Sequence, residues 1–139
     1  MSFERDLQSG KAAEILFRRW CDAAGFYSQA AIGSNPAWDV LLRASIEIKH
    51  DARAPSTGNF FIETHSHGKP SGVSITHSTT YALVTGKACY LVGVELLKSI
   101  LPTLAERSVA DGKKLGRILP IGRLLAMPHH AIDLREFQE

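Results

Sequence analysis

The feature that most constrains the fold is a short stretch of strict alternation, residues 45–50, which reads Ser-Ile-Glu-Ile-Lys-His. Successive side chains of a β-strand point to opposite faces of the sheet, so Ile46 and Ile48 share one face while Glu47 and Lys49 share the other. The segment therefore predicts a strand that carries a carboxylate and an ammonium group side by side. Such a strand requires a sheet to belong to.

A second strand is expected just before it, over residues 37–42, and it contains a single carboxylate, Asp39. Asp is a poor strand former, and burying an unpaired carboxylate is costly, so a compensating group is expected nearby. A divalent cation, Mg²⁺ or Mn²⁺, is the simplest candidate. An odd-length connection or a bulge between the two strands would place Asp39 across from Glu47, with Cβ atoms about 5 Å apart, from where both could chelate one cation.

The N-terminal segment predicts a long helix over residues 3–24 that ends at Gly25, a typical C-terminal cap. One face of it follows steps of four and three, through Phe3, Leu7, Gly10, Glu14, Phe17, Cys21 and Ala24. Glu14 is the one carboxylate on this face, and Gly10 would allow a close approach to the sheet. We therefore expect Glu14 to meet the sheet and join the metal site, although it could instead pair with Lys11 or Arg18 at helical spacing.

The rest of the chain alternates short apolar segments with turns. We expect strands at 27–32, 59–66, 82–85 and 88–94, helices at 74–81 and 94–101, a loop at 51–58, turns at 68–72 and 111–114, and extended segments at 118–126 and 131–134. This order predicts one domain over residues 1–139, an α/β (α+β) fold with a twisted mixed sheet and helices on both faces.

The set of Glu14 on a helix, Asp39 on a strand and Glu47-Ile48-Lys49 on the next strand resembles the PD-(D/E)XK nuclease superfamily. Its short spacings are most similar to those of small phage endonucleases and Holliday-junction resolvases. The resemblance covers residues 10–94, and it departs from the family pattern in having Trp38 directly before Asp39, with Pro36 further ahead. It implies a restriction-endonuclease-like mixed β-sheet flanked by helices.

The same resemblance implies a divalent-metal-dependent endonuclease that hydrolyses DNA phosphodiester bonds, with branched or structured DNA as a candidate substrate. Asp39, Glu47 and Lys49 would be catalytic. The metal ligands would be Glu14, Asp39, Glu47 and the carbonyl group of Ile48. Lys49 would position or activate the attacking water and stabilise the developing negative charge.

Three further residues could support this site. Glu63 lies on the expected strand 59–66, where a surface carboxylate is an equal alternative. Lys69 and Ser71 belong to the turn 68–72, which could contact a nucleic-acid backbone or be a plain turn. The histidine pairs His65/His67 and His129/His130 lack a third ligand at zinc spacing, so surface or substrate-contacting roles are expected.

Composition restricts the partners only weakly. The formal net charge is +2, so a DNA partner requires the basic groups to gather on one face. The two cysteines, Cys21 and Cys89, are expected to be core thiols. No apolar run approaches a membrane span and the N-terminus lacks a signal pattern, so we expect no membrane association and a cytoplasmic location in a bacterium or virus-infected cell. Residues 118–127 could supply a homodimer interface or could be core.

Two other functions are compatible with the same residues. A non-catalytic nucleic-acid-binding module that keeps the nuclease fold would bind DNA without cutting it. A hydrolase of some other phosphoester would use the same metal chemistry on a small substrate. Taken alone, Glu47 and Lys49 could also be the solvated face of an edge strand.

Overall fold

The computed structural model describes residues 3–32 and 39–137. The helices of this part are α1 Phe3–Ala24, α2 Ala54–Thr57, α3 Val94–Ile100 and α4 Ile121–Leu125, with 3-10 turns at Gly72–Ser74, Leu101–Thr103 and Arg135–Phe137. The strands are β1 Tyr27–Ala30, β2 Val40–Arg43, β3 Ile46–His50, β4 Asn59–Ser66, β5 Lys69–Pro70, β6 Thr80–Thr85, β7 Ala88–Gly93, β8 Glu106–Val109, β9 Lys114–Pro120 and β10 His130–Asp133. The fold is mixed α+β, as predicted.

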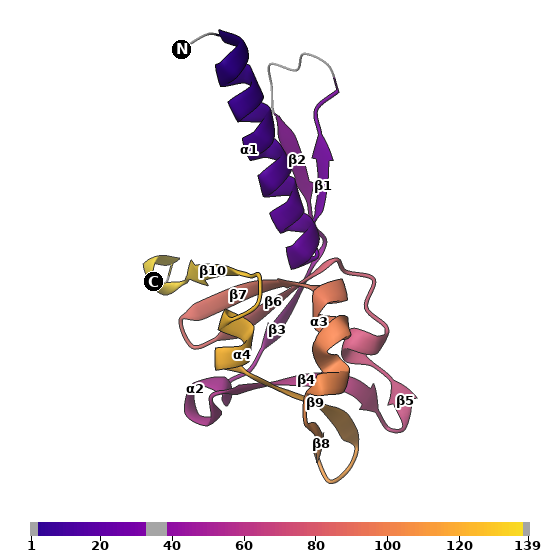
Figure 1. Cartoon of the computed structure of the whole chain (residues 1–139). Helices are drawn as coiled ribbons and strands as arrows, with labels where there is room; N and C mark the ends of the chain where they lie inside the picture. The colour runs from indigo at the N-terminus through magenta and orange to yellow at the C-terminus, as the bar shows by residue number, and fades with distance from the viewer. Residues whose placement is uncertain (1–2, 33–38, 138–139) are drawn as a thin grey trace.

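The strands form three separate sheets (Figure 1). The first is the antiparallel hairpin β1–β2. The second has the order β10-β7-β6-β3, in which β3 runs parallel to β6 and lies at the edge. The third has the order β5-β4-β9-β8 and is antiparallel throughout.

The main core lies between the second and third sheets and under the helices that cover them. Tyr81 and Leu83 of β6 pack there with Phe60 and Ile62 of β4. Leu97 of α3, Leu119 of β9 and Leu124 of α4 complete the same cluster, and all three are fully buried. The alternation of β4, with Phe60 and Ile62 buried and its odd-numbered residues partly exposed, follows from one core-facing side of a sheet.

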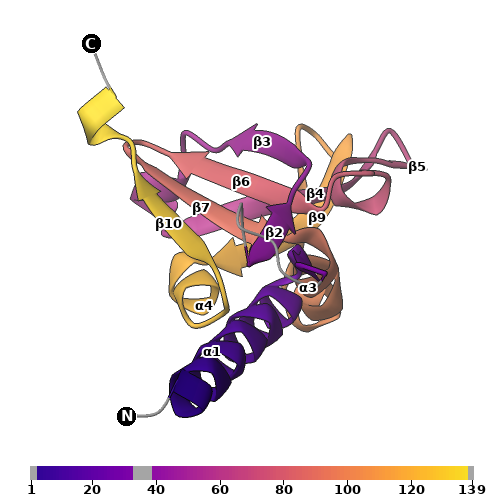
Figure 2. The same cartoon turned by 90° about the horizontal axis from the view of Figure 1, so that it is seen from above.

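Helix α1 and the β1–β2 hairpin lie side by side and project away from the other two sheets (Figures 1 and 2). The helix ends as expected, because Gly25 adopts φ 79°, and the amides of Gly25 and Phe26 bond the carbonyls of Asp22 and Cys21, a Schellman cap. The C-terminal end of α1 reaches the body, where Cys21, Ala24 and Phe26 form a small cluster with Leu91.

Two glycines make that junction possible. Gly25 and Gly93 lie back to back, and a Cβ atom on Gly93 would fall 2.0 Å from the carbonyl oxygen of Ala24. No side chain fits between the two backbones. The N-terminal unit is therefore joined to the body through a tight glycine contact at the end of β7.

The prediction of a β2–β3 pair is wrong. β2 pairs with β1, in the register Tyr27↔Arg43 to Ala30↔Val40, whereas β3 pairs with β6. The residues between the two strands do not form a hairpin turn. Instead, the Ser45 hydroxyl accepts from the Thr79 amide and the Thr79 hydroxyl accepts from the Ser45 amide, each at 3.0 Å, which directs β3 into the second sheet.

Two other expectations differ from the structure. The helix expected at 74–81 is wrong: β6 already begins at Thr80, because the Thr79 hydroxyl bonds the Ser45 amide and the amides of Thr79 and Thr80 bond the Ser45 carbonyl. The extended segment expected at 118–126 is half right, since β9 ends at Pro120 and α4 follows. The expected loop 51–58 also contains the short helix α2. Residues 37 and 38 of the strand expected at 37–42 lie outside the described part.

Candidate functional site

The expected pair Glu47 and Lys49 lies together on one face of β3. The Lys49 Nζ is 2.7 Å from Glu47 Oε1, and the Thr76 hydroxyl donates to Glu47 Oε2 at 2.6 Å. The hydrogen bonds from Lys49 and then Thr76 hold the pKa of Glu47 below its ordinary value of 4.5. Glu47 is therefore a firmly ionised carboxylate whose two oxygens both have donors.

Tyr81 lies directly beside this pair, because the parallel register places it opposite Glu47. The Lys49 Nζ is 5.8 Å from the centroid of the Tyr81 ring. The residue is 2% exposed, and its hydroxyl is buried with no hydrogen-bond partner among the described residues. Burial first, and then the charges of Glu47 and Glu63, raise the pKa of Tyr81 to about 12, so the hydroxyl keeps its proton.

A second acid, Glu63 of β4, adjoins the first group. The Ser71 hydroxyl donates to Glu63 Oε2 at 2.9 Å, and the Lys114 Nζ lies 3.1 Å from Glu63 Oε1. Burial acts to raise the pKa of Glu63, but the hydrogen bonds from Lys114 and Ser71 and the charges of Lys114 and Lys49 outweigh it, so that the pKa is lowered. Lys49, Glu63, Tyr81 and Lys114 line one cleft, and Glu47 adjoins it through its ion pair with Lys49.

This group opens into a cleft of about 590 Å³. One wall is the face of the third sheet that carries Phe61, Glu63, Arg107 and Lys114. The other wall comes from the end of β3 and the segment after it, with Lys49, Asp51 and Arg53. Asp51 is engaged structurally, because it accepts the amides of Arg53 and Phe61. The cleft is therefore lined by more cations than anions, as a site for an anionic ligand requires.

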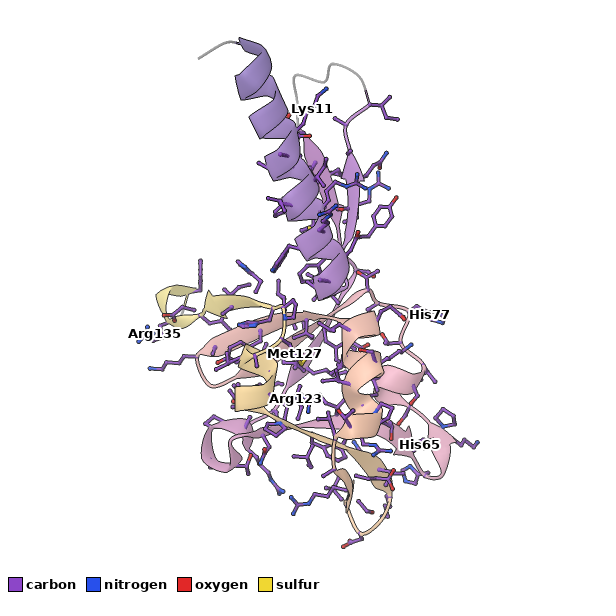
Figure 3. All side chains as sticks on the ribbon, viewed as in Figure 1. Lys11, His65, His77, Arg123, Met127 and Arg135 are labelled. Atoms are coloured by element: carbon purple, nitrogen blue, oxygen red, sulfur yellow. The ribbon has the colours of Figure 1, made fainter. Side chains whose placement is uncertain are left out.

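Two expected metal ligands lie elsewhere. Asp39 is exposed directly before β2, and its carbonyl oxygen accepts the amide of Ala31 across the projecting hairpin. Glu14 is half-buried on α1, one turn after Lys11, which Figure 3 shows on the projecting part of that helix. Gly10 is exposed with open space around it, so the expected close approach of the helix to the sheet is wrong. In residues 3–32 and 39–137, no three acidic, histidine or cysteine side chains gather in a group that could hold a metal ion.

The remaining expected residues fall in different places. Ile48 lies on β3 between the two site residues, with its side chain 72% exposed on the opposite face. Lys69 is exposed on β5, away from the cleft lining. The His65 ring bonds the Thr64 hydroxyl and the His129 ring bonds the Met127 carbonyl, so both rings have partners within the chain. Figure 3 shows His65 and His77 pointing outward from the same flank.

Sequence reasoning missed Tyr81, Thr76 and Lys114. Tyr81 and Thr76 fell in the segment interpreted as a helix, and Lys114 in a segment interpreted as a turn. No local pattern marks them, because each reaches the site through strand pairing or a crossover between distant parts of the chain.

Comparisons with known proteins found no match for this chain. The chain matches no protein-family profile, no curated protein and no solved structure. None of the helices in the described ranges is both long and apolar enough to cross a bilayer.

Proposed function

We propose that the chain is a divalent-metal-dependent nuclease that hydrolyses phosphodiester bonds of DNA at the cleft beside Glu47, Lys49 and Glu63. The observation that carries the proposal is the convergence of two ionised carboxylates, each paired with a lysine, around one buried tyrosine hydroxyl at a cationic cleft. The restriction-endonuclease-like fold and the PD-(D/E)XK assignment remain part of this proposal.

The two carboxylates, Glu47 and Glu63, match the number of protein ligands that a hard cation of the Mg²⁺ type needs. Mg²⁺ is usually bound by one or two carboxylates together with waters and substrate phosphates, so it does not need a cage of three protein acids. Glu47 and Glu63 would be its ligands, and binding would require Lys49 and Lys114 to release the carboxylate oxygens that they now contact. A bound cation would supply an acidified water and would polarise a phosphodiester oxygen.

Other residues of the site would bind the phosphates and orient the two carboxylates. Lys49 lies beside Glu47, where its ammonium group would hold a phosphate oxygen and stabilise the charge that develops on it. Thr76 and Ser71 orient the two carboxylates through their hydroxyl groups. Lys114 and Arg107 would hold neighbouring phosphates on the other wall of the cleft.

The test is a cleavage assay with Mg²⁺ or Mn²⁺ on linear duplex, nicked, single-stranded and four-way-junction DNA, with EDTA as the metal-free control. We expect Glu47→Gln and Lys49→Ala each to lower the cleavage rate by about 100-fold or more, because each removes a group that acts on the reacting phosphate. Wild-type protein that cuts none of these substrates, or a Glu47→Gln variant with unchanged activity, would exclude the mechanism.

The variant Asp39→Asn, tested in the same assay, shows whether the metal is held by Asp39 and Glu47 or by Glu47 and Glu63. A loss as large as that of Glu47→Gln would assign Asp39 to the metal, as the sequence pattern implies, and would require the hairpin to close onto β3 when DNA binds. Retained activity together with a loss in Glu63→Gln would assign the metal to Glu47 and Glu63.

A second candidate function is a non-catalytic nucleic-acid-binding module. It is favoured by the separation of Glu14 and Asp39 from Glu47, and by the lysine that already pairs with each of Glu47 and Glu63. This alternative predicts that DNA is retained without being cut and that binding does not depend on divalent metal.

A further inference from the structure

One face of the third sheet combines an aromatic ring, Phe61, with Arg107, a cation that has no ion-pair partner among the described residues. Phe61 of β4 is directly opposite Ile118 of β9, and Arg107 of β8 is opposite Gly116 of the same strand. Phe61, Arg107 and Ile118 line the cleft, and the register places Gly116 on the same face, which points away from the main core. The surface is therefore a cationic sheet face with an aromatic side chain at its centre.

The Phe61 ring is held against the backbone of Gly116. A Cβ atom at position 116 would lie 2.6 Å from the Cζ atom of Phe61, so any other residue there would displace the ring. The ring is half-buried, with Gly116 under it and the cleft beside it. A ring fixed in this way offers a flat apolar surface and loses little conformational entropy when a ligand covers it.

The charges around the ring suit a sugar-phosphate backbone. Arg53 and Arg107 line the cleft and form no ion pair with any carboxylate of the described chain. Lys49 and Lys114 each share their charge with one glutamate. The cleft thus presents two free guanidinium groups, which can bind phosphate oxygens in a bidentate manner.

The Tyr81 hydroxyl is an independent sign that a ligand belongs in this cleft. Tyr81 is 2% exposed and is one of the residues that line the cleft, and its buried hydroxyl lacks a hydrogen-bond partner among the described residues. A buried hydroxyl without a partner costs free energy, which a hydrogen bond to a bound acceptor would recover. A phosphate oxygen is an acceptor that the neighbouring lysines would attract.

We propose that this cleft binds an unpaired nucleotide of single-stranded DNA, with its base stacked on Phe61 and its phosphates held by Arg107, Arg53 and the Tyr81 hydroxyl. An unpaired strand is required because the bases of a duplex are already stacked on one another and cannot present a free face to the ring. The inference deepens the proposed nuclease function, on which it rests for its choice of DNA, by naming the substrate form.

The test measures binding without cleavage. Fluorescence anisotropy in EDTA follows a labelled oligo-dT of about 12 nucleotides, within the range that single-strand-binding grooves cover, against a duplex of equal length and an oligo-rU. We expect the dT strand to bind at least about tenfold tighter than the duplex. Phe61→Leu, which keeps an apolar side chain but loses the ring, should weaken dT binding by about 5- to 100-fold. Phe61→Tyr keeps an aromatic ring and should bind dT like the wild type.

Two matched controls separate the site from general effects. Phe17→Leu makes the same change at an exposed ring on α1 and should leave dT binding unchanged. Arg107→Gln should reduce the slope of log affinity against log salt concentration by about 0.7, the value for one phosphate contact on a single strand. Arg123→Gln, on α4 at the other face of the sheet, should not change that slope.

Equal or tighter duplex binding, or a Phe61→Leu variant that binds dT like the wild type, would overturn the inference. Tighter binding of rU than of dT would overturn the assignment to DNA. The outcomes are separate from those of the cleavage assay. A protein that binds dT through Phe61 and cuts nothing loses only the nuclease proposal, whereas one that cuts duplex and single strands equally, without regard to Phe61, loses only this inference.

Discussion

At the scale of single residues, neighbouring side chains keep the two glutamates at the cleft ionised. Glu47 and Glu63 are kept ionised by donors from β3, from Thr76 and Ser71, and from β9. Their negative charge in turn helps to keep the Tyr81 hydroxyl protonated. The site therefore presents fixed carboxylates next to a neutral donor at neutral pH.

The lowered pKa values predict a pH dependence of stability. A carboxyl group whose pKa is lower in the folded than in the unfolded protein stabilises the fold fully above its unfolded value, here about 4.5, and loses that contribution as the pH falls through the lowered pKa. We expect the free energy of unfolding, measured with urea, to decrease from about pH 5 downward. In Glu47→Gln the decrease should be shallower, and a slope equal to that of the wild type would contradict the prediction.

The buried hydroxyl of Tyr81, which has no partner in the described structure, predicts that its removal stabilises the fold. Tyr81→Phe removes a polar group that lacks a partner in the described structure, so we expect the free energy of unfolding to rise by about 1 kcal/mol. Tyr27→Phe, at an exposed tyrosine, should change it by less than about 0.5 kcal/mol. A clear destabilisation by Tyr81→Phe in urea titration would mean that the hydroxyl has a partner in solution.

At the scale of elements, close backbone contacts decide how the helices and strands meet. The N-terminal helix touches the body where Gly25 crosses Gly93, and the third sheet accepts the Phe61 ring because β9 has a glycine under it. Strand β3 enters the second sheet through the reciprocal bonds between Ser45 and Thr79. Each of these junctions depends on one or two small residues.

The variants Gly93→Ala and Gly10→Ala test whether the glycine contact holds the junction, because they should change the free energy of unfolding in opposite directions. Gly93→Ala should lower the free energy of unfolding by about 2 kcal/mol or more, because the new Cβ atom would collide with the Ala24 carbonyl oxygen. Gly10→Ala lies within α1 in open space, so it should raise helix stability by about 0.5 to 1 kcal/mol. Urea midpoints of the two variants check both, and equal effects would contradict the junction described here.

At the scale of the whole molecule, the chain divides into a well-packed body and a projecting unit of α1 and the β1–β2 hairpin (Figure 1). The body holds the main core. The projecting unit leaves large apolar side chains partly in solvent, among them Ile15, Leu16, Phe17 and Ile32. The segment 118–127, expected to be either a homodimer interface or core, includes Leu119 and Leu124, which are fully buried core residues.

The unequal packing predicts unequal protection of backbone amides. Elements with few buried contacts open more readily, so amides of β1 and β2 should exchange with deuterium faster than those of β6 and β7. Hydrogen-exchange mass spectrometry on the free protein measures this difference directly. Equal protection of the hairpin and of the β6–β7 pair would show that another surface covers the hairpin in solution.

Local patterns in the sequence determined most elements of this fold and one half of the candidate site. The period of α1 and its glycine cap predicted that helix, and alternation predicted β3 and β4, because these signals depend only on neighbours along the chain. The same alternation placed Glu47 and Lys49 on one face. Strand pairing between distant segments was decided by tertiary structure alone. It joined β3 to β6 rather than to β2, and it left Asp39 on the hairpin. It also brought Glu63, Lys114 and Tyr81 to the cleft. Hydrogen bonds of the Ser45 and Thr79 hydroxyls, and burial in the common core, stabilise this arrangement.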